Sequence, residues 1–152
     1  MGDRGGEQGK KLLVLLLVLC APLIAGLAGM LFSGLLPMDQ DSLERAIIGY
    51  GTLVLGFFSG ARLGRTLLTG DTKRSIWLVL LLPALGLLVV VMPFTTALAL
   101  LIVGFGAQGA WDSWSGFRGA LAKDYAAQRR AITLIICLTL VAILVLHGLA
   151  NA

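Results

Sequence analysis

The sequence predicts an all-α protein, a polytopic membrane bundle of five transmembrane helices. Of its 152 residues, 58% are hydrophobic and only 13% are charged, whereas a soluble domain carries about 25% charged residues. The apolar residues are gathered into long uncharged runs that short polar segments separate. So short a chain cannot bury this much apolar surface in a water-soluble core, so lipid must solvate much of it.

The first predicted helix covers residues 12–36, an uncharged run of 25 residues. A run of this length can cross a hydrocarbon core of about 30 Å. It is too long for the apolar part of a secretion signal, which has about 7–15 residues. Residues 1–11 are glycine-rich and polar, so they are expected to form a disordered cytoplasmic tail. Residues 12–152 then make a single transmembrane domain.

The second predicted helix covers residues 43–66 and follows a short acidic loop in which Asp41 or Ser42 can cap it. Its uncharged stretch, residues 46–61, has 16 residues. That gives about 24 Å of helix, which is shorter than the hydrocarbon core. Arg62 is therefore expected at or just inside a membrane interface.

The third and fourth predicted helices share one uncharged run of 37 residues, 75–111. This run is too long for a single crossing. Pro93 lies in its middle, which predicts a tight hairpin between helices at 75–92 and 94–112. Pro83 should kink the first of these helices, because proline removes a backbone hydrogen bond.

The fifth predicted helix covers residues 131–150 and follows the longest polar connection. Within that connection Phe117, Leu121 and Tyr125 recur every four residues. Two interpretations remain open for residues 114–127: a short helix lying in the membrane plane and an irregular loop.

Lysine and arginine residues gather on one side of the predicted bundle. Eleven of them lie in the N-terminal segment and the second and fourth connections, and only Arg45 lies on the other side. Such residues concentrate on the cytoplasmic side of membrane proteins. The N-terminus is therefore expected in the cytoplasm and the C-terminus outside.

Glycines form a regular face on the second predicted helix, where Gly56, Gly60 and Gly64 follow one another at four-residue intervals and Gly49 shares their side. Glycine allows another helix to approach closely. This face is expected to pack on a helix of the same chain or of an oligomer partner. Residues 104–109 match the dinucleotide pattern G-x-G-x-x-G, but that motif needs a βαβ unit. Close helix packing is the interpretation for these glycines too.

A candidate polar cluster lies at the predicted inner interface. Asp112 ends a helix, where the dipole disfavours negative charge, and Arg129 lies near a helix start, where it disfavours positive charge. Partners would relieve both, and a pair of Asp112 with Arg62 or with Arg129 is expected. Alternatively each charge reaches the headgroups by itself. The members of the candidate cluster are Arg62, Gln108, Asp112, Tyr125 and Arg129.

The sequence indicates neither an enzyme nor a cofactor. The midplane parts of the five predicted spans hold no acidic residue, histidine, lysine or arginine, and coupled transport sites usually need an ionisable group at that depth. No catalytic or metal-ligating pattern is present. Basic residues do not interleave with aromatics on a soluble module, so a nucleic-acid partner is not expected.

The segment at residues 50–64, Tyr-Gly-Thr-Leu-Val-Leu-Gly-Phe-Phe-Ser-Gly-Ala-Arg-Leu-Gly, resembles a signature of a small membrane-protein family of unknown function. That family includes bacterial proteins and the eukaryotic transmembrane protein 69. Leu63 stands where the signature has Trp. Further likenesses, over about residues 22–140, are Pro83, Asp112, Tyr125, Arg129 and Thr133. The resemblance implies a five-helix protein, here expected in a bacterial cytoplasmic membrane, and no particular reaction.

Three classes of function remain. The first is a non-catalytic scaffold or assembly partner in the membrane, which the glycine face favours. The second is a small transporter or channel component, which would have to act as an oligomer because five helices are few for a pore. The third is a binder of anionic lipid headgroups at the cytoplasmic arginines. The expected partners are accordingly the lipid bilayer, a second copy or other membrane proteins, and anionic lipid.

Overall fold

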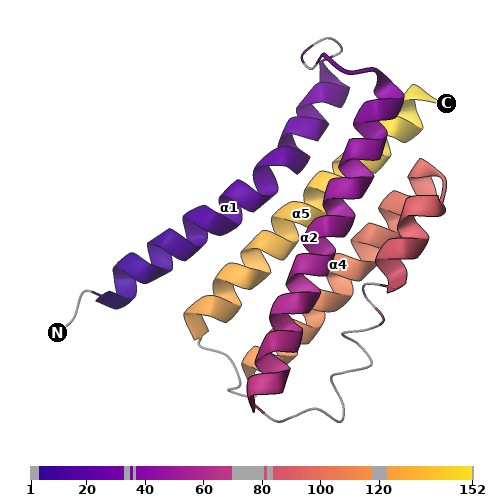
Figure 1. Cartoon of the computed structure of the whole chain (residues 1–152). Helices are drawn as coiled ribbons and strands as arrows, with labels where there is room; N and C mark the ends of the chain where they lie inside the picture. The colour runs from indigo at the N-terminus through magenta and orange to yellow at the C-terminus, as the bar shows by residue number, and fades with distance from the viewer. Residues whose placement is uncertain are drawn as a thin grey trace.

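The computed structural model describes residues 4–32, 35, 37–69, 81, 84–117 and 123–151. These residues lie in helices or in the connections between helices. The labelled helices are α1 (Arg4–Leu31), α2 (Gln40–Thr69), α4 (Phe94–Phe117) and α5 (Lys123–Ala150). A further helical segment, residues 84–91, precedes α4. The predicted all-α bundle of five helices is confirmed (Figure 1).

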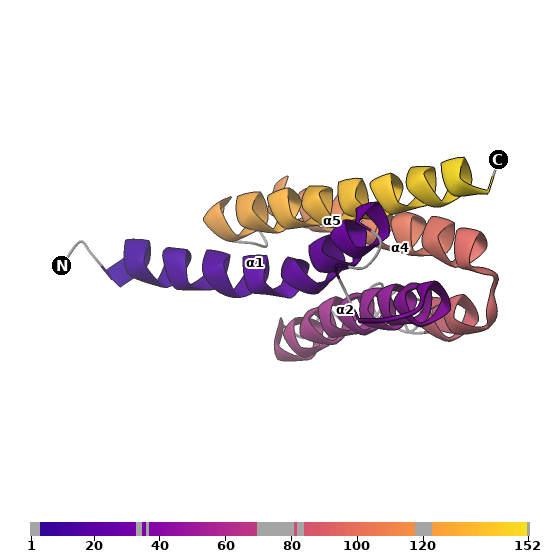
Figure 2. The same ribbon diagram turned by 90° about the horizontal axis from the view of Figure 1, so that it is seen from above.

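The helices form an up-and-down bundle. In Figure 1, α1 and α5 run in one direction, and α2 and α4 run in the opposite direction. Helix α1 contacts α2 and α5, and α4 contacts the same two helices, so the four surround a shared core. The N-terminal half of α1 projects away from the other helices (Figure 2).

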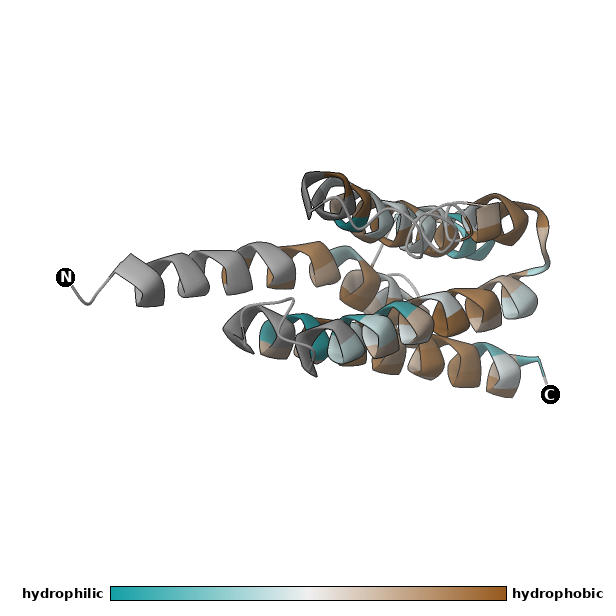
Figure 3. Cartoon of the chain, turned by 90° about the horizontal axis from the view of Figure 1, so that it is seen from below, coloured by the Kyte–Doolittle hydropathy of each residue, from teal (hydrophilic) through white to brown (hydrophobic). Residues whose placement is uncertain are grey.

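The outward surface of the bundle is apolar, as expected of a protein that lipid solvates. Stretches of α2, α4 and α5 are long and apolar enough to cross a membrane: Gln40–Gly64, Phe94–Trp114 and Ala127–Ala150. Helix α1 contributes a shorter apolar stretch, Leu17–Leu31. Large side chains such as Leu53 and Leu138 are 63% and 67% exposed. In Figure 3 hydrophobic residues, drawn in brown, lie along the helices of the bundle. In water this exposure would favour aggregation.

The core is built from one face of each helix. On α5 the buried hydrophobic residues follow the helical period of 3.6 and are Ile132, Ile136, Leu140 and Ile143. The exposed residues between them, Leu134 and Leu138 among others, are equally apolar. Composition therefore separates the two faces poorly, and packing distinguishes them.

The hairpin predicted at Pro93 is confirmed. Helical residues end at 91 and α4 begins at Phe94. The Met92 N–H donates to the Val89 carbonyl at 3.3 Å, and the Ala97 N–H donates to the Pro93 carbonyl at 2.9 Å. The kink predicted at Pro83 lies outside the described residues.

The start of α2 is capped by Asp39, two residues before Asp41, the nearer of the two expected caps. The Ser42 N–H donates to its carboxylate at 3.0 Å, which satisfies a donor that the helix start leaves without a partner. Hydrogen bonds from the side chain and the backbone of Ser42 lower the pKa of Asp39.

One predicted boundary is wrong. Helix α1 begins at Arg4, so residues 4–11 are helical where a disordered tail is expected; Glu7, Lys10 and Lys11 favour helix. Residues 114–117 belong to α4 and residues 123–127 to α5. The middle of the predicted segment 114–127, where an in-plane helix and an irregular loop are the two interpretations, lies outside the described residues.

Residues near the start of α2, the start of α4 and the end of α5 lie in contact with one another. The Nδ1 atom of His147 lies 3.1 Å from Glu44 Oε1. The ring of His147 meets that of Phe94 edge to face, with the centroids 4.8 Å apart. The single histidine thus lies between the ends of three helices, near the C-terminus of the chain.

Candidate functional site: a buried arginine–aspartate bridge

Three charged residues meet where α2 and α4 end and α5 begins. At 1.5 Å per residue, Arg62 lies about 33 Å beyond the start of α2, and Asp112 lies about 27 Å beyond the start of α4. Arg129 lies about 32 Å before the end of α5 by the same measure. These lengths match a hydrocarbon core of about 30 Å, so the three residues occupy one boundary of the apolar region. We call it the arginine end of the bundle.

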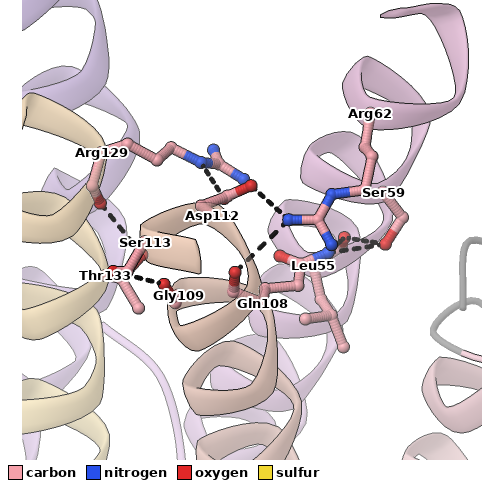
Figure 4. A network of polar contacts seen from close by, with 9 residues as sticks. All are labelled: Leu55, Ser59, Arg62, Gln108, Gly109, Asp112, Ser113, Arg129 and Thr133. Carbon is pink, nitrogen blue, oxygen red and sulfur yellow. Dashed lines mark hydrogen bonds and ion pairs between the residues drawn. The ribbon is translucent and has the colours of Figure 1, made fainter. Parts of the chain in front are cut away.

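One carboxylate joins the three helices. Asp112 Oδ1 on α4 accepts a hydrogen bond from Arg62 Nη2 on α2. Its second oxygen, Oδ2, accepts from Arg129 Nε on α5 at 2.9 Å (Figure 4). Arg62, Asp112 and Arg129 are 7%, 6% and 5% exposed. We call these three residues the Asp112 bridge.

Aromatic rings lie beside both guanidinium groups. The ring centroid of Phe58 is 3.5 Å from Arg129 Cζ, and that of Trp111 is 6.0 Å from Arg62 Cζ. A cation near an aromatic face is attracted by the ring quadrupole, more strongly where water is excluded. The rings thus replace part of the hydration that the buried arginines lose.

A second polar layer lies one helical turn below the bridge. Gln108 Nε2 donates to Ser59 Oγ at 2.7 Å and to the Leu55 carbonyl at 3.4 Å. Arg62 Nη2 also donates to the Gln108 carbonyl at 3.4 Å. The buried Oε1 atom of Gln108 accepts no hydrogen bond from the residues that the structure describes. This layer is a second polar contact between α2 and α4, in addition to that of Arg62 with Asp112.

Close approach of α4 and α5 beside the bridge depends on Gly109. A Cβ atom at this position would lie 2.7 Å from Thr133 Cγ2 and 3.3 Å from Thr133 Cβ. Gly109 and Thr133 stand three and four residues from Asp112 and Arg129, about one turn away. The Thr133 hydroxyl donates to the Arg129 carbonyl at 3.0 Å. The missing side chain of Gly109 therefore lets Arg129 come within reach of Asp112.

The glycine face predicted on α2 does not pack within the described part of the chain. No described atom lies within 4 Å of a Cβ built at Gly49, Gly56, Gly60 or Gly64. Gly60 stands two residues from both Phe58 and Arg62, about 200° around the helix, so it points away from the core. Packing of these glycines on a helix of the same chain is therefore not seen among the described residues, because the glycines occupy the side of α2 opposite the bridge. The alternative, a contact with an oligomer partner, stays a prediction.

Other glycines make the close helix contacts. A Cβ at Gly51 would meet Leu101 Cδ1 at 2.8 Å, and one at Gly104 would meet side-chain atoms of Leu55 and Leu85 at 3.1 Å. In the G-x-G-x-x-G segment, Gly104 and Gly109 thus lie close to side chains of neighbouring helices. At Gly106 no described atom lies within 4 Å.

Four of the five residues predicted for the polar cluster come together: Arg62, Gln108, Asp112 and Arg129. Tyr125 lies in α5, but its side chain is outside the described residues. Sequence reasoning missed Phe58 and Ser59, which share a helix face with Arg62 because they precede it by four and three residues. That spacing on α2 is the signal that identifies them.

The bridge contains two cations and one anion, all largely removed from water. Breaking such a buried set leaves an uncompensated charge, which is costly. Its clearest physical role is to fix the positions of α2, α4 and α5. In the part of the chain that the structure describes, no three His, Cys, Asp or Glu side chains are grouped as metal ligands would be.

Comparison with known proteins gives a family. The model of a family described as "Protein of unknown function (DUF3429)" matches residues 10–145. The chain belongs to this family. Neither a curated protein nor a solved structure matches the chain. The family description assigns no activity, so the function has to be inferred from the geometry above.

Removing the charge of Asp112 should destabilise the fold strongly. Asp112→Asn leaves two buried arginines without a carboxylate, and we expect a loss of about 3–5 kcal/mol in unfolding free energy. Asp41→Asn is the matched control, because Asp41 is exposed in the first turn of α2 and its removal should cost less than about 1 kcal/mol. Thermal or denaturant melting in mild detergent measures both. Equal losses for the two variants would show that the bridge does not hold the helices.

Proposed function

We propose that this protein is a non-catalytic membrane scaffold that assembles with a second copy of itself through the open glycine face of α2. The observation that carries the proposal is the open space at Gly49, Gly56, Gly60 and Gly64. Glycine in a helix costs about 1 kcal/mol relative to alanine, and nothing described in the chain fills the space that these residues leave.

The surroundings of the glycine face suit another transmembrane helix. Leu53 and Phe57 flank it and are 63% and 56% exposed. Gly49, Gly56 and Gly60 lie within residues 46–61, which carry no charge, so most of the face lies in the apolar region of the bundle. Small residues at four-residue spacing let two helix backbones approach and gain van der Waals contact where no hydrophobic force between helices exists.

A second copy is the partner that this face fits most directly. Two-fold symmetry places the same patch on both sides of an interface, so the patch must complement itself. A row of glycines does so, because each backbone can lie against the groove of the other while Leu53 and Phe57 pack along its edges. The Asp112 bridge on the other side of α2 would hold that helix in place for assembly.

We further propose that the N-terminus lies in the cytoplasm and that the protein resides in a bacterial cytoplasmic membrane. The distribution of lysine and arginine supports the orientation, since eleven lie toward one side and Arg45 alone toward the other. The likeness of residues 50–64 to bacterial proteins and transmembrane protein 69 supports this location. It also supports a relationship of the chain to those proteins.

The orientation can be tested with reporters fused after Ala152. Five crossings from a cytoplasmic N-terminus place the C-terminus outside, so alkaline phosphatase should be active there and green fluorescent protein dark. An inactive phosphatase fusion together with a bright fluorescent fusion would refute either the number of crossings or the cytoplasmic location of the N-terminus.

Enlarging the glycine face should abolish assembly without unfolding the monomer. Gly60→Leu should shift the protein from dimer to monomer in native mass spectrometry from mild detergent, and its melting temperature as a monomer should stay within about 2 °C, because surface changes are usually small.

Gly109→Leu is the matched contrast, because a side chain there meets Thr133. We expect this variant to lower stability by about 1–3 kcal/mol through overpacking. A wild-type chain that is monomeric in every mild detergent, or a Gly60→Leu variant that stays dimeric, would refute the proposal.

A further inference from the structure

The Asp112 bridge carries more positive than negative charge. The buried charged side chains in the described ranges are Arg62, Asp112 and Arg129, which sum to one positive charge. A net charge held away from water is unfavourable unless an opposite charge accompanies it. Arg62 makes a further contact besides those given above, so the place for a further anionic group is at Arg129.

Arg129 is the side chain best suited to hold that group. A guanidinium carries five N–H groups, and Arg129 uses its Nε to reach Asp112. Its two terminal nitrogens donate no hydrogen bond to any residue that the structure describes. Figure 4 shows one of them on the side of Asp112 that faces away from Gln108. Arg129 is 5% exposed, and its terminal nitrogens are not among the fully buried side-chain atoms that lack a partner. They therefore reach the outside of the bundle, where an acceptor from outside the chain can meet them.

We propose that the terminal nitrogens of Arg129 bind the phosphate of an anionic phospholipid headgroup at the arginine end of the bundle. Guanidinium groups bind phosphate oxygens through two parallel hydrogen bonds. Phe58 lies against the guanidinium, and Asp112 holds its Nε. Both contacts fix the direction in which the remaining donors point, so the site is preorganised.

The position of Arg129 favours a lipid over a soluble anion. The Asp112 bridge lies at one boundary of the apolar region, which is the depth of headgroup phosphates. Trp111 and Trp114 on α4 are 38% and 62% exposed at the same end, and tryptophan marks membrane interfaces. Arg130 is exposed beside Arg129 and adds attraction for an anionic membrane surface.

The charge balance points in the same direction. A phosphodiester carries one negative charge, which equals the net charge of the Asp112 bridge. A free phosphate is a mixture of the monoanion and the dianion near neutral pH, so on average it would overcompensate it. The site is separate from the glycine face of α2, so it holds whether or not the chain assembles.

The test uses the purified chain in mild detergent with three probes: phosphatidylglycerol, phosphatidylcholine and inorganic phosphate. Native mass spectrometry should show one phosphatidylglycerol retained per chain, and that lipid should raise the melting temperature more than phosphatidylcholine does. Equal retention of the two lipids would overturn the proposal. Stabilisation by inorganic phosphate equal to that by phosphatidylglycerol would overturn the assignment to a lipid.

Two variants locate the site. Arg129→Lys keeps the charge and a donor for Asp112 but lacks the guanidinium fork, and should weaken retention of phosphatidylglycerol about tenfold. Arg130→Gln removes a charge beside the site without touching the bridge, and should change retention less than about twofold. A larger loss for Arg130→Gln than for Arg129→Lys would show attraction by general charge alone and refute the site. The comparison of probes on the unmodified chain stands even if Arg129→Lys does not fold.

Discussion

The contact of one carboxylate with two guanidinium groups fixes the arrangement of this bundle. Asp112 is the only buried acid among the described residues, and each of its oxygens holds an arginine from a different helix. In an apolar surrounding a buried charge must find a partner, so the bridge sets the relative positions of α2, α4 and α5. The narrow contact of Gly109 with Thr133 and the hydrogen bond of Gln108 with Ser59 lie within about one turn of it.

Much of the fold follows from the lengths of the uncharged runs. The sequence predicts five helices and a hairpin at Pro93, because a membrane span needs about 20 apolar residues and proline interrupts the helix. The meeting of Arg62, Asp112 and Arg129 follows from unfavourable helix dipoles and from the short apolar stretch of α2. These arguments use position along the chain, which the sequence contains. The helix ends are less certain, because good helix formers continue beyond a membrane interface at little cost, as at Arg4 and Phe117.

Which face of each helix points toward the core could not be predicted in the same way. Lipid and protein core are both apolar, so Leu138 on the outside of α5 and Leu140 on the inside have similar surroundings in chemical terms. The glycines of α2 were therefore expected against a neighbouring helix, although they point away from the bridge. The buried polar residue Arg62 is the better guide to the inward face, because it needs a partner, and Phe58 and Ser59 lie on its side. This asymmetry leaves a glycine face outside and an incompletely balanced cation inside, and the two functional proposals arise from them.

The central claim is that Asp112 couples energetically to both arginines. Double-mutant cycles of Asp112→Asn with Arg62→Gln and with Arg129→Gln, followed by melting in detergent, measure each coupling free energy without the effects of the single changes. We predict coupling of about 1–3 kcal/mol in both cycles, which is the range for residues in one ion-pair network. Coupling near zero in both would mean that each charge reaches the headgroups separately and that the bridge does not organise the bundle.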